Sequence, residues 1–352
     1  MSISSDHIID VYVDGKQLKG AVLQHVTSIT VAESFERLDM MEVVFAVPDK
    51  GKSRDDVMDL AKHGAKLKMD MKSDGKSGRV LEGTVVEVGY DGGSGHGMHM
   101  SLRGLSLLTK VKSTQFAKVH EGDDAAVIKA IASEAGLGAD VQGVDGTGEF
   151  FFQPNLTNAE TVQEIARRNN YVVRVDEGKL VFSRVSKAGG GAKLKIPWMH
   201  VSDFRLEQSL DGVVTDVMVT GKDLKANKWL KGKAAAGDVA SISGGDTATA
   251  LAKKAFGKVQ RLIDHTDDAD QSQLVAMAKG ELQRRAERFV RGEFTTTFQA
   301  DARTGAQLTF EDTIDWAMAG PFIVSEVTQL FDAREGYRTR FSVISDSLPP
   351  KK

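Results

Sequence analysis

The chain has 352 residues, of which 41% are hydrophobic and 27% charged, and its formal net charge is −3. This composition is typical of a soluble globular protein of two or three domains, and it gives no reason to expect nucleic acid or an anionic membrane as a partner. The absence of cysteine excludes disulfides, thiol nucleophiles and thiolate metal sites, and no apolar run is long enough to span a membrane.

The first region, residues 1–115, is predicted to be a small antiparallel β-barrel or sandwich. Met98, Met100 and Leu102 alternate with polar residues, the two-residue period of a strand that is buried on one face. Similar runs occupy residues 26–33, 40–47 and 80–90, with turn residues at 73–75 and 91–93. Aspartates among the short apolar runs of residues 1–30 argue against a signal peptide.

The second region, residues 116–195, is predicted to be an α/β insert. A helix is expected to begin near Asp123 and to end at Gly136. Thr157 and Glu160 have the spacing of a capping box, which predicts the start of a second helix. A hairpin over residues 171–184 and a glycine-rich linker over 188–192 complete the region.

The third region, residues 196–348, is predicted to be a second β-barrel followed by a short tail, residues 349–352. Its strands are expected at residues 213–219, 294–299, 322–331 and 337–344, and a helix at 271–291. Residues 222–262 are rich in lysine, glycine and alanine. We expect them to form a long excursion with a short helix around 247–257 and no core of its own, covered by a partner.

The two predicted barrels contain an internal repeat. Residues 64–107 align without a gap to residues 305–348, starting with Gly64-Ala65-Lys66-Leu67 against Gly305-Ala306-Gln307-Leu308. Apolar, turn and acidic positions then keep phase, with Val86 against Val327. Three copies of a chain with two related units would present six of them, which allows a three-fold object to meet a six-fold one.

Residues with metal-binding chemistry do not form a convincing site in the sequence. His96 and His99 lie in a glycine-rich segment without a neighbouring carboxylate. The segment His265–Asp270 is dense in oxygen ligands, but it lacks the glycine and the distal glutamate of a calcium loop. Helix capping at 271 explains its aspartates better.

Candidate catalytic and phosphate-binding motifs also fail on spacing. Gly75-Lys76-Ser77 and Gly93–Gly97 join two strands, whereas a phosphate loop joins a strand to a helix. Adjacent acidic pairs such as Asp55-Asp56 and Asp123-Asp124 have diverging side chains. Glu33 and Glu36 could be proposed as a glycosidase pair, but a solvated strand edge explains them. The sequence therefore predicts no enzyme, and no catalytic, cofactor-binding or metal-binding residue.

One stretch resembles a known family. Phe150–Glu160 is an aromatic run that ends in Gln-Pro and a polar cap, and Val162–Tyr171 follows it with a helix pattern and an aromatic hairpin start. This order resembles the contractile-tail hub proteins: the phage late control D proteins, the T4-type baseplate hub and the N-terminal part of the VgrG spike proteins. Phe35, Leu102-Arg103-Gly104, Thr304–Leu308 and Phe322–Val327 fit the same pattern.

The resemblance covers nearly the whole chain and implies a fold and a role. The expected fold is a β-rich α+β chain with two similar small, tube-like antiparallel β-barrels that flank an α/β insert. The expected role is a trimeric baseplate hub that joins the hexameric tail tube to a central spike, with other baseplate proteins as further partners. The spike is expected to be a separate chain, as in the D-protein arrangement, because 352 residues leave no room for it.

Two other functions remain open on the sequence. One is a tail-associated cell-wall hydrolase, which would need carboxylates or histidines that converge in a cleft. The other is a β-rich binding module unrelated to tails, with the lysine-rich excursion as its contact surface. For the hub we expect assembly in the bacterial cytoplasm and a final place in the baseplate of a virion or injection particle. Phage, tailocin and secretion-like injector are equally compatible with the residues.

Overall fold

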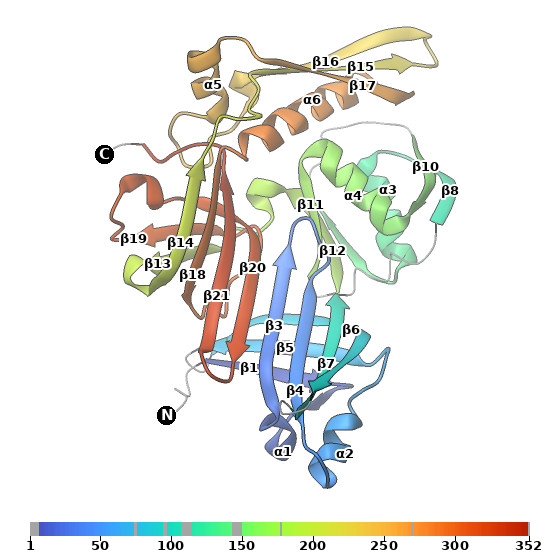
Figure 1. Ribbon diagram of the computed structural model, residues 1–352. Coiled ribbons are helices and arrows are strands. Elements are labelled where there is room, and N and C mark those ends of the chain that lie inside the picture. Colours follow the sequence, from blue (N-terminus) through green and yellow to red (C-terminus); the bar gives the residue numbers. More distant parts are fainter. Residues whose placement is uncertain are drawn as a thin grey trace.

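The computed structural model describes residues 7–73, 76–93, 97–106, 115–142, 150–176, 178–268 and 270–350. Its main feature is a 13-stranded sheet in which strands from the two ends of the chain lie side by side (Figure 1). Three smaller sheets belong to the middle of the chain and to the segment before the last helix. The chain is therefore β-rich, as predicted. Over these residues, no helix is long and apolar enough to cross a membrane.

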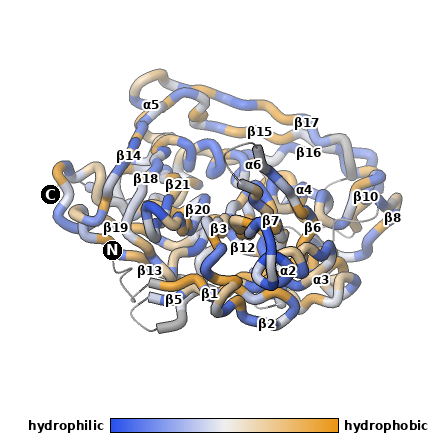
Figure 2. Tube along the Cα trace, turned by 60° about the horizontal axis from the view of Figure 1, so that its bottom comes forward, coloured by the Kyte–Doolittle hydropathy of each residue, from blue (hydrophilic) through white to orange (hydrophobic). Residues whose placement is uncertain are grey.

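The large sheet is built from both predicted β-regions. Its N-terminal strands are β1 (His7–Val13), β2 (Lys16–Gln17), β3 (Val26–Ser34), β4 (Met40–Val47), β5 (Lys66–Ser73), β6 (Lys76–Gly93) and β7 (Gly97–Ser106). Its C-terminal strands are β13 (Lys193–Pro197), β14 (Val201–Gln208), β18 (Val290–Thr297), β19 (Gln307–Glu311), β20 (Phe322–Asp332) and β21 (Gly336–Ser345). The short helices α1 (Gly20–Leu23) and α2 (Lys52–Met58) lie between the N-terminal strands. Hydrophobic and polar residues alternate along the strands, which lets one face of the sheet be buried (Figure 2).

Eight of these strands form two equivalent units. The first unit is β3–β4–β7–β6 and the second unit is β14–β18–β21–β20, each in that spatial order and antiparallel throughout. In β21, which lies between β18 and β20, Phe341 and Val343 are buried, as their alternation predicted. Tyr337 at its start packs on Phe331, with ring centroids 4.6 Å apart.

The β-bulges of the two units occur at equivalent positions. The ladder between β6 and β7 skips Val86, and the ladder between β20 and β21 skips Ser325. The ladder between β3 and β4 skips Thr27, whose hydroxyl donates to Val44 O at 3.2 Å. In the second unit Ser202 is skipped, and its hydroxyl donates to Thr295 O at the same distance, 3.2 Å. Bulges at equivalent places support a duplication, because each bulge changes the direction of a strand in the same way.

The gapless alignment of the repeat is nevertheless wrong beyond its first strand. In the first unit Lys66 pairs with Thr84, and in the second unit Gln307 pairs with Ile323, so the second copy is two residues shorter at this turn. Val86 therefore corresponds to Ser325 and not to Val327. The error arose because the apolar positions repeat every two residues, so a shift of two keeps hydrophobic residues in phase.

The two units form one continuous sheet because β20 of the second unit pairs with β3 of the first. We call this contact the internal joint. Each unit has its own buried core, but Phe298 and Ala300, which follow β18, pack in the core of the first unit. The two units are thus joined edge to edge in one continuous sheet, whereas two separate barrels were predicted.

The insert has a separate core. Its elements are β8 (Gln115–Glu121), α3 (Asp124–Glu134), β9 (Gly138–Val141), β10 (Phe150–Thr157), α4 (Asn158–Asn169), β11 (Tyr171–Asp176) and β12 (Lys179–Arg184). The predicted capping box is confirmed, because Glu160 N donates to Thr157 Oγ1 at 3.1 Å and Thr157 N to Glu160 Oε2 at 2.8 Å. Helix α4 ends at Asn170, whose φ of 55° is left-handed. The predicted hairpin is β11–β12.

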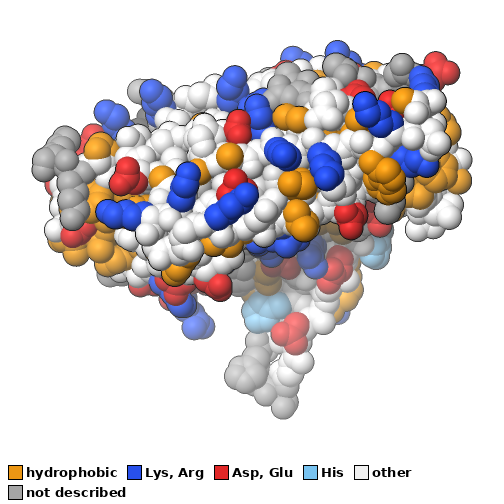
Figure 3. Space-filling view, turned by 90° about the horizontal axis from the view of Figure 1, so that it is seen from above, with side chains coloured by type: hydrophobic (Ala, Val, Ile, Leu, Met, Phe, Trp, Pro, Cys, Tyr) orange, Lys and Arg blue, Asp and Glu red, His pale blue; other side chains and the backbone are white. Residues whose placement is uncertain are grey.

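The lysine-rich excursion contains the short helix that was predicted around 247–257, and it also forms strands that were not predicted. Its strands belong to a three-stranded sheet of β15 (Asp216–Asp223), β16 (Lys228–Ala235) and β17 (Gln260–Asp268), with α5 (Ala248–Phe256) before β17. This sheet packs on α6 (Gln271–Ala286), and we call the two together the arm (Figure 1). Seen from above, Lys and Arg side chains mix with hydrophobic ones over this end of the molecule (Figure 3). Short 3-10 turns complete the chain at Val185–Lys187, Trp198–His200, Ala236–Asp238 and Trp316–Met318.

Candidate functional site

The glutamates that a glycosidase would need do not face one cleft. Glu33 is buried in β3, where it pairs with Val327 across the internal joint. Glu36 is exposed in the following turn and lines the two neighbouring clefts, which Glu33 does not. Retaining and inverting glycosidases both require two carboxylates on either side of one bond. This arrangement therefore does not supply the catalytic pair of a glycosidase.

The candidate metal ligands are not brought together. The described part of the chain contains no group of three or more histidines and acidic residues that could hold a metal ion. His96 and the central residues of the 93–97 glycine motif lie outside the described residues, as does Gly75. His99 is half-buried in β7, and His265 lies in β17. Asp270 caps α6, because its Oδ1 accepts from Gln273 N at 2.8 Å.

The adjacent acidic residues of the insert have structural partners. Asp123 caps α3 by accepting from Ala126 N at 2.9 Å. Asp124 is buried and forms an ion pair with Arg168 and a hydrogen bond from Asn169 Nδ2 of 2.7 Å. Both carboxylates are therefore used in helix capping and in fixing α4 against α3.

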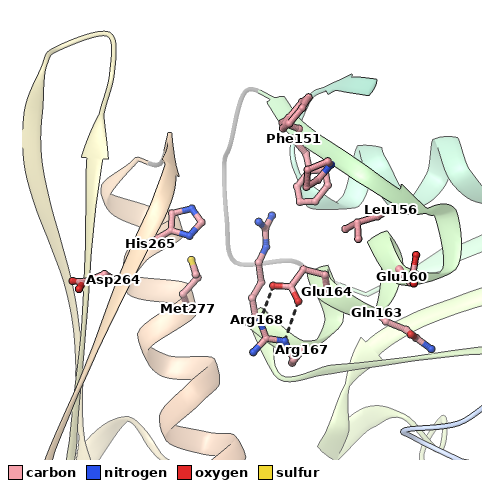
Figure 4. Close-up of a pocket in the computed structure, with 12 residues that line it drawn as sticks. Phe151, Leu156, Glu160, Gln163, Glu164, Arg167, Arg168, Asp264, His265 and Met277 are labelled. Atoms are coloured by element: carbon pink, nitrogen blue, oxygen red, sulfur yellow. Dashed lines mark hydrogen bonds and ion pairs between the residues drawn. The ribbon is translucent and has the colours of Figure 1, made fainter. Parts of the chain in front are cut away.

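A cleft of about 590 Å³ lies between the insert and the arm (Figure 4). Arg167 and Arg168 of α4 point into it, with Phe151 on one wall and His265 and Met277 on the other. Arg167 forms hydrogen bonds of 2.9 and 2.7 Å with Glu164, and the Arg168 guanidinium lies 5.0 Å from the centre of the Phe151 ring. Both arginines of the cleft therefore already have partners.

A buried carboxylate lies where α6 meets the end of α4. Glu287 accepts hydrogen bonds from Asn170 Nδ2, 3.1 and 3.0 Å to its two oxygens, and from Gln283 Nε2 at 3.2 Å. Gln283 Nε2 also donates to Asp346 Oδ2 at 2.9 Å, so one amide bridges two carboxylates. Burial raises the pKa of Glu287 to about 8, and the nearby Asp346 carboxylate raises it as well. Burial also raises the pKa of Asp346.

The strongest candidate site is a pair of open sheet edges. In the internal joint, residues Glu326–Asp332 of β20 pair with β3. The equivalent residues of β6, Glu87–Gly93, pair with β7 on one side, and no described strand pairs with them on the other. Strand β14 is equivalent to β3, and among the described strands it pairs only with β18. The chain therefore has a β20-like edge and a β3-like edge that are both open.

Large hydrophobic side chains are exposed at these two edges. Tyr90 of β6 is 53% exposed and Val86 is 45% exposed. Phe204 of β14 is 41% exposed, whereas its counterpart Ile29 of β3 is buried. Charged side chains lie between them, with Arg205 Nε donating to Glu207 Oε1 at 2.9 Å along β14. An edge with mixed charge and exposed aromatic rings is suited to a specific partner strand.

The sequence pattern predicts the strand that contains one of these edges but not the strand that contains the other. Residues 80–90 were predicted as a strand, but β14 was not, although Phe204 and Leu206 alternate there with charged residues. An alignment of the repeat with its two-residue gap, extended to β3, identifies β14 as the second copy of β3. The open edges themselves depend on strand order, which a single sequence does not contain.

Comparison with known proteins supports the fold. A family model described as the Alg8 N-terminal domain matches residues 5–330 of the chain. Among proteins of curated function, none matches the sequence.

Three solved structures are similar over almost the whole chain. The 43 kDa tail protein of prophage MuSo2 from Shewanella oneidensis has a TM-score of 0.68 at 14% identity, covering 97% of this chain and 98% of that one. The tail protein from Neisseria meningitidis MC58 has a TM-score of 0.67 at 14% identity, with the same coverage of 97% and 98%.

The third comes from a secretion system. It is the E. coli c3393 protein, described as a component of the type VI secretion system with structural similarity to the T4 bacteriophage tail proteins gp27 and gp5. Its TM-score is 0.57 at 10% identity, covering 97% of this chain and 79% of that one. At these identities the likeness shows a shared fold.

Proposed function

The chain belongs to the family described as the Alg8 N-terminal domain. From its fold, which it shares with phage tail proteins, we propose that it is a structural baseplate hub of a contractile phage tail or a related injection system. The hub is a homotrimer that joins the hexameric tail tube to the central spike, and it contacts other baseplate proteins around it. Its place is the baseplate of the virion or injection particle, after assembly in the bacterial cytoplasm.

One observation carries this proposal: a four-stranded unit occurs twice in one chain, edge to edge in one sheet, and equivalent edges are left open. Three chains supply six such units in a ring. A six-fold tube subunit can then meet six similar surfaces, while a three-fold spike meets three identical chains. The tail proteins that share the fold support the same role.

No observation favours the alternative of a cell-wall hydrolase. Glu33 is part of the internal joint. In the cleft beside the insert, Arg167 is paired with Glu164, and Arg168 is paired with Asp124. If the chain were a binding module unrelated to tails, its likeness to tail proteins would be a coincidence. That function would also not explain why the open edges of β6 and β14 are complementary.

Mass measurement tests the proposal. Native mass spectrometry and sedimentation equilibrium of the purified chain, over increasing concentration, are expected to show a monomer in equilibrium with a species of three copies. Addition of the spike protein should shift the population toward that species. A stable two-fold dimer, or a monomer at every concentration with and without the spike, would overturn the proposal.

A further inference from the structure

We propose that the ring closes by antiparallel pairing of β6 in one copy with β14 in the next, in a register that places Asp91 opposite Arg205. This inference rests on the proposed function, because it requires several copies of the chain in one assembly. It names the partner of each open edge as the other edge of the same chain. The internal joint already has the geometry that the contact between copies needs.

The internal joint defines the register. Strands β20 and β3 pair antiparallel from Glu326 opposite Ser34 to Asp332 opposite Ser28. Between these ends Leu330 lies opposite Thr30. Both strands carry a bulge just outside the paired segment, at Ser325 and at Thr27, so the paired length is fixed on both strands.

The same bulges transfer this register to the open edges. Since Val86 is equivalent to Ser325, Glu87 corresponds to Glu326 and Asp91 to Leu330. Since Ser202 is equivalent to Thr27, Arg205 corresponds to Thr30. Replacing each residue of the internal joint by its counterpart therefore places Asp91 directly opposite Arg205.

The backbone pattern makes this a close pair. In the internal joint Phe35 N donates to Ser325 O at 3.1 Å, and Ala333 N donates to Thr27 O at 3.0 Å. Hydrogen-bonded and non-hydrogen-bonded pairs alternate along an antiparallel ladder. Phe35 and Thr27 therefore both belong to hydrogen-bonded pairs. Thr30 lies an odd number of residues from each of them, so Thr30 and Leu330 form a non-hydrogen-bonded pair. The Cα atoms of Asp91 and Arg205 are then about 4.5 Å apart, and their side chains are at their closest.

The buried face of the new contact would also be completed. Tyr90 comes to lie opposite Leu206, at the position where Gln329 and Val31 are both buried in the internal joint. The neighbouring pair sets the Phe204 ring opposite Gly92, and a glycine leaves room for a ring to cover the partner strand. The exposed aromatic side chains of the two edges are thus the ones that this pairing would cover.

Charge selects this pairing over the two symmetric alternatives. Two β14 strands in a two-fold contact would bring Asp203, Arg205 and Glu207 of one copy against the same residues of the other. Two β6 strands would bring two Asp91 carboxylates toward each other, and like charges across a ladder repel. Asp91 and Arg205 attract only when different edges meet, which is the head-to-tail contact that builds a ring.

The absence of cysteine makes cross-linking a clean test of the register. In the double variant with Asp91→Cys and Arg205→Cys, the two cysteines of neighbouring copies would face each other. Their Cα atoms would lie within the separation found in disulfides, about 4.4–6.8 Å. Asp91→Cys combined with Glu207→Cys is the matched control, because this diagonal pair is about 7–8 Å apart. Oxidation followed by denaturing electrophoresis is expected to give covalent dimers and trimers for the first variant, and at least several-fold less for the control.

The outcomes separate the register from the hub itself. A species of three copies in which both variants cross-link equally, or in which the Asp91–Arg205 variant does not, would overturn the register and leave the trimer standing. A chain that never associates would overturn both.

Charge exchange gives a second test. Asp91→Arg and Arg205→Asp should each weaken association at least several-fold, and the double variant should restore it. Both residues are exposed, so circular dichroism should show that all three variants remain folded. A double variant as weak as the single ones would overturn the ion pair.

Discussion

Phe341 is a large side chain in the core of the second unit. It is fully buried in β21, pairs with Phe294 of β18, and belongs to the same core cluster as Leu308 and Phe322. Phe341→Ala is expected to lower the free energy of unfolding by about 3–5 kcal/mol, because it leaves a cavity in a packed interior. Urea denaturation followed by far-UV circular dichroism measures this.

Met199→Ala is the control for that experiment. Met199 is 85% exposed, so its truncation should change the free energy of unfolding by no more than about 0.5 kcal/mol. If both variants unfold at the wild-type urea concentration, the alternation along β21 does not define a core.

Glu287 predicts a pH dependence of stability. Its pKa is about 8 in the folded chain because burial disfavours the charged form, against an ordinary value of 4.5. Between these two values the unfolded chain has released the proton and the folded chain has kept it, so the contribution to stability falls as pH rises. Below pH 4.5 the contribution is fully present, and above pH 8 it is lost.

Glu287→Gln isolates this effect. The amide is neutral at every pH and can still accept from Asn170 Nδ2. The variant should gain stability relative to the wild type by up to about 1.4 kcal/mol per pH unit across this window, with a constant difference outside it. Parallel urea denaturation curves between pH 5 and pH 9 test this, and a difference that does not change with pH would contradict a buried neutral Glu287.

Two glycines of the arm allow its helix and its sheet to pack closely together. A Cβ on Gly232 of β16 would lie 2.1 Å from Leu274 O of α6, and one on Gly221 of β15 would lie 2.8 Å from Leu274 Cδ2. Only glycine lets the helix lie this close to the sheet. The high glycine content of residues 222–262 suggested a segment without a core, but in the structure Gly232 of this segment and Gly221 just before it are needed for α6 to pack on β16 and β15.

Limited trypsin digestion examines the arm directly. We expect the first cuts in the isolated chain at the turn between β15 and β16, after Lys225 or Lys228, and near Lys258 after α5. Arg284 and Arg285 of α6 should be cut later, because both are bound to Glu281 and only partly exposed.

The assembled tail is the comparison for these cuts. There the same sites should be protected if a neighbouring protein covers the arm. Equal cutting in both states would remove the arm as an interface, and resistance in both would show that its turns are held by the fold alone.

Local signals in the sequence predicted where the helices of the insert and of the arm begin. The Thr157 and Glu160 capping box gave the start of α4, and the aspartate before residue 271 gave the start of α6. Helix α6 ends at Ala286 and not at residue 291, because the chain turns there to begin β18 at Val290. Caps and alternation are local, so one sequence contains them.

At the scale of the whole molecule, the decisive contacts are not local. Strand β3 pairs with β20 almost 300 residues later, and no pattern of either segment specifies the other. The repeat predicted that two related units exist, but their adjacency and the two open edges follow only from the order of the strands. The phosphate-loop motifs fail on their spacing, but the interpretation of Glu33 as part of a solvated strand edge is wrong, because Glu33 is buried in the internal joint. That position and the candidate interface both depend on the fold.

The second unit contributes core residues to the first unit, and this has an evolutionary consequence. Phe298 and Ala300 are encoded in the second half of the chain and fill the interior of the first half. A backbone contact reinforces this, because Gly78 of β6 has no space for a side chain beside Ala300. If the chain arose by fusion of two identical ancestors, the first half no longer has a complete interior of its own, whereas the core cluster of the second unit contains only residues of the second half. The first half would then depend on the second for its fold, and the dependence would run in one direction only.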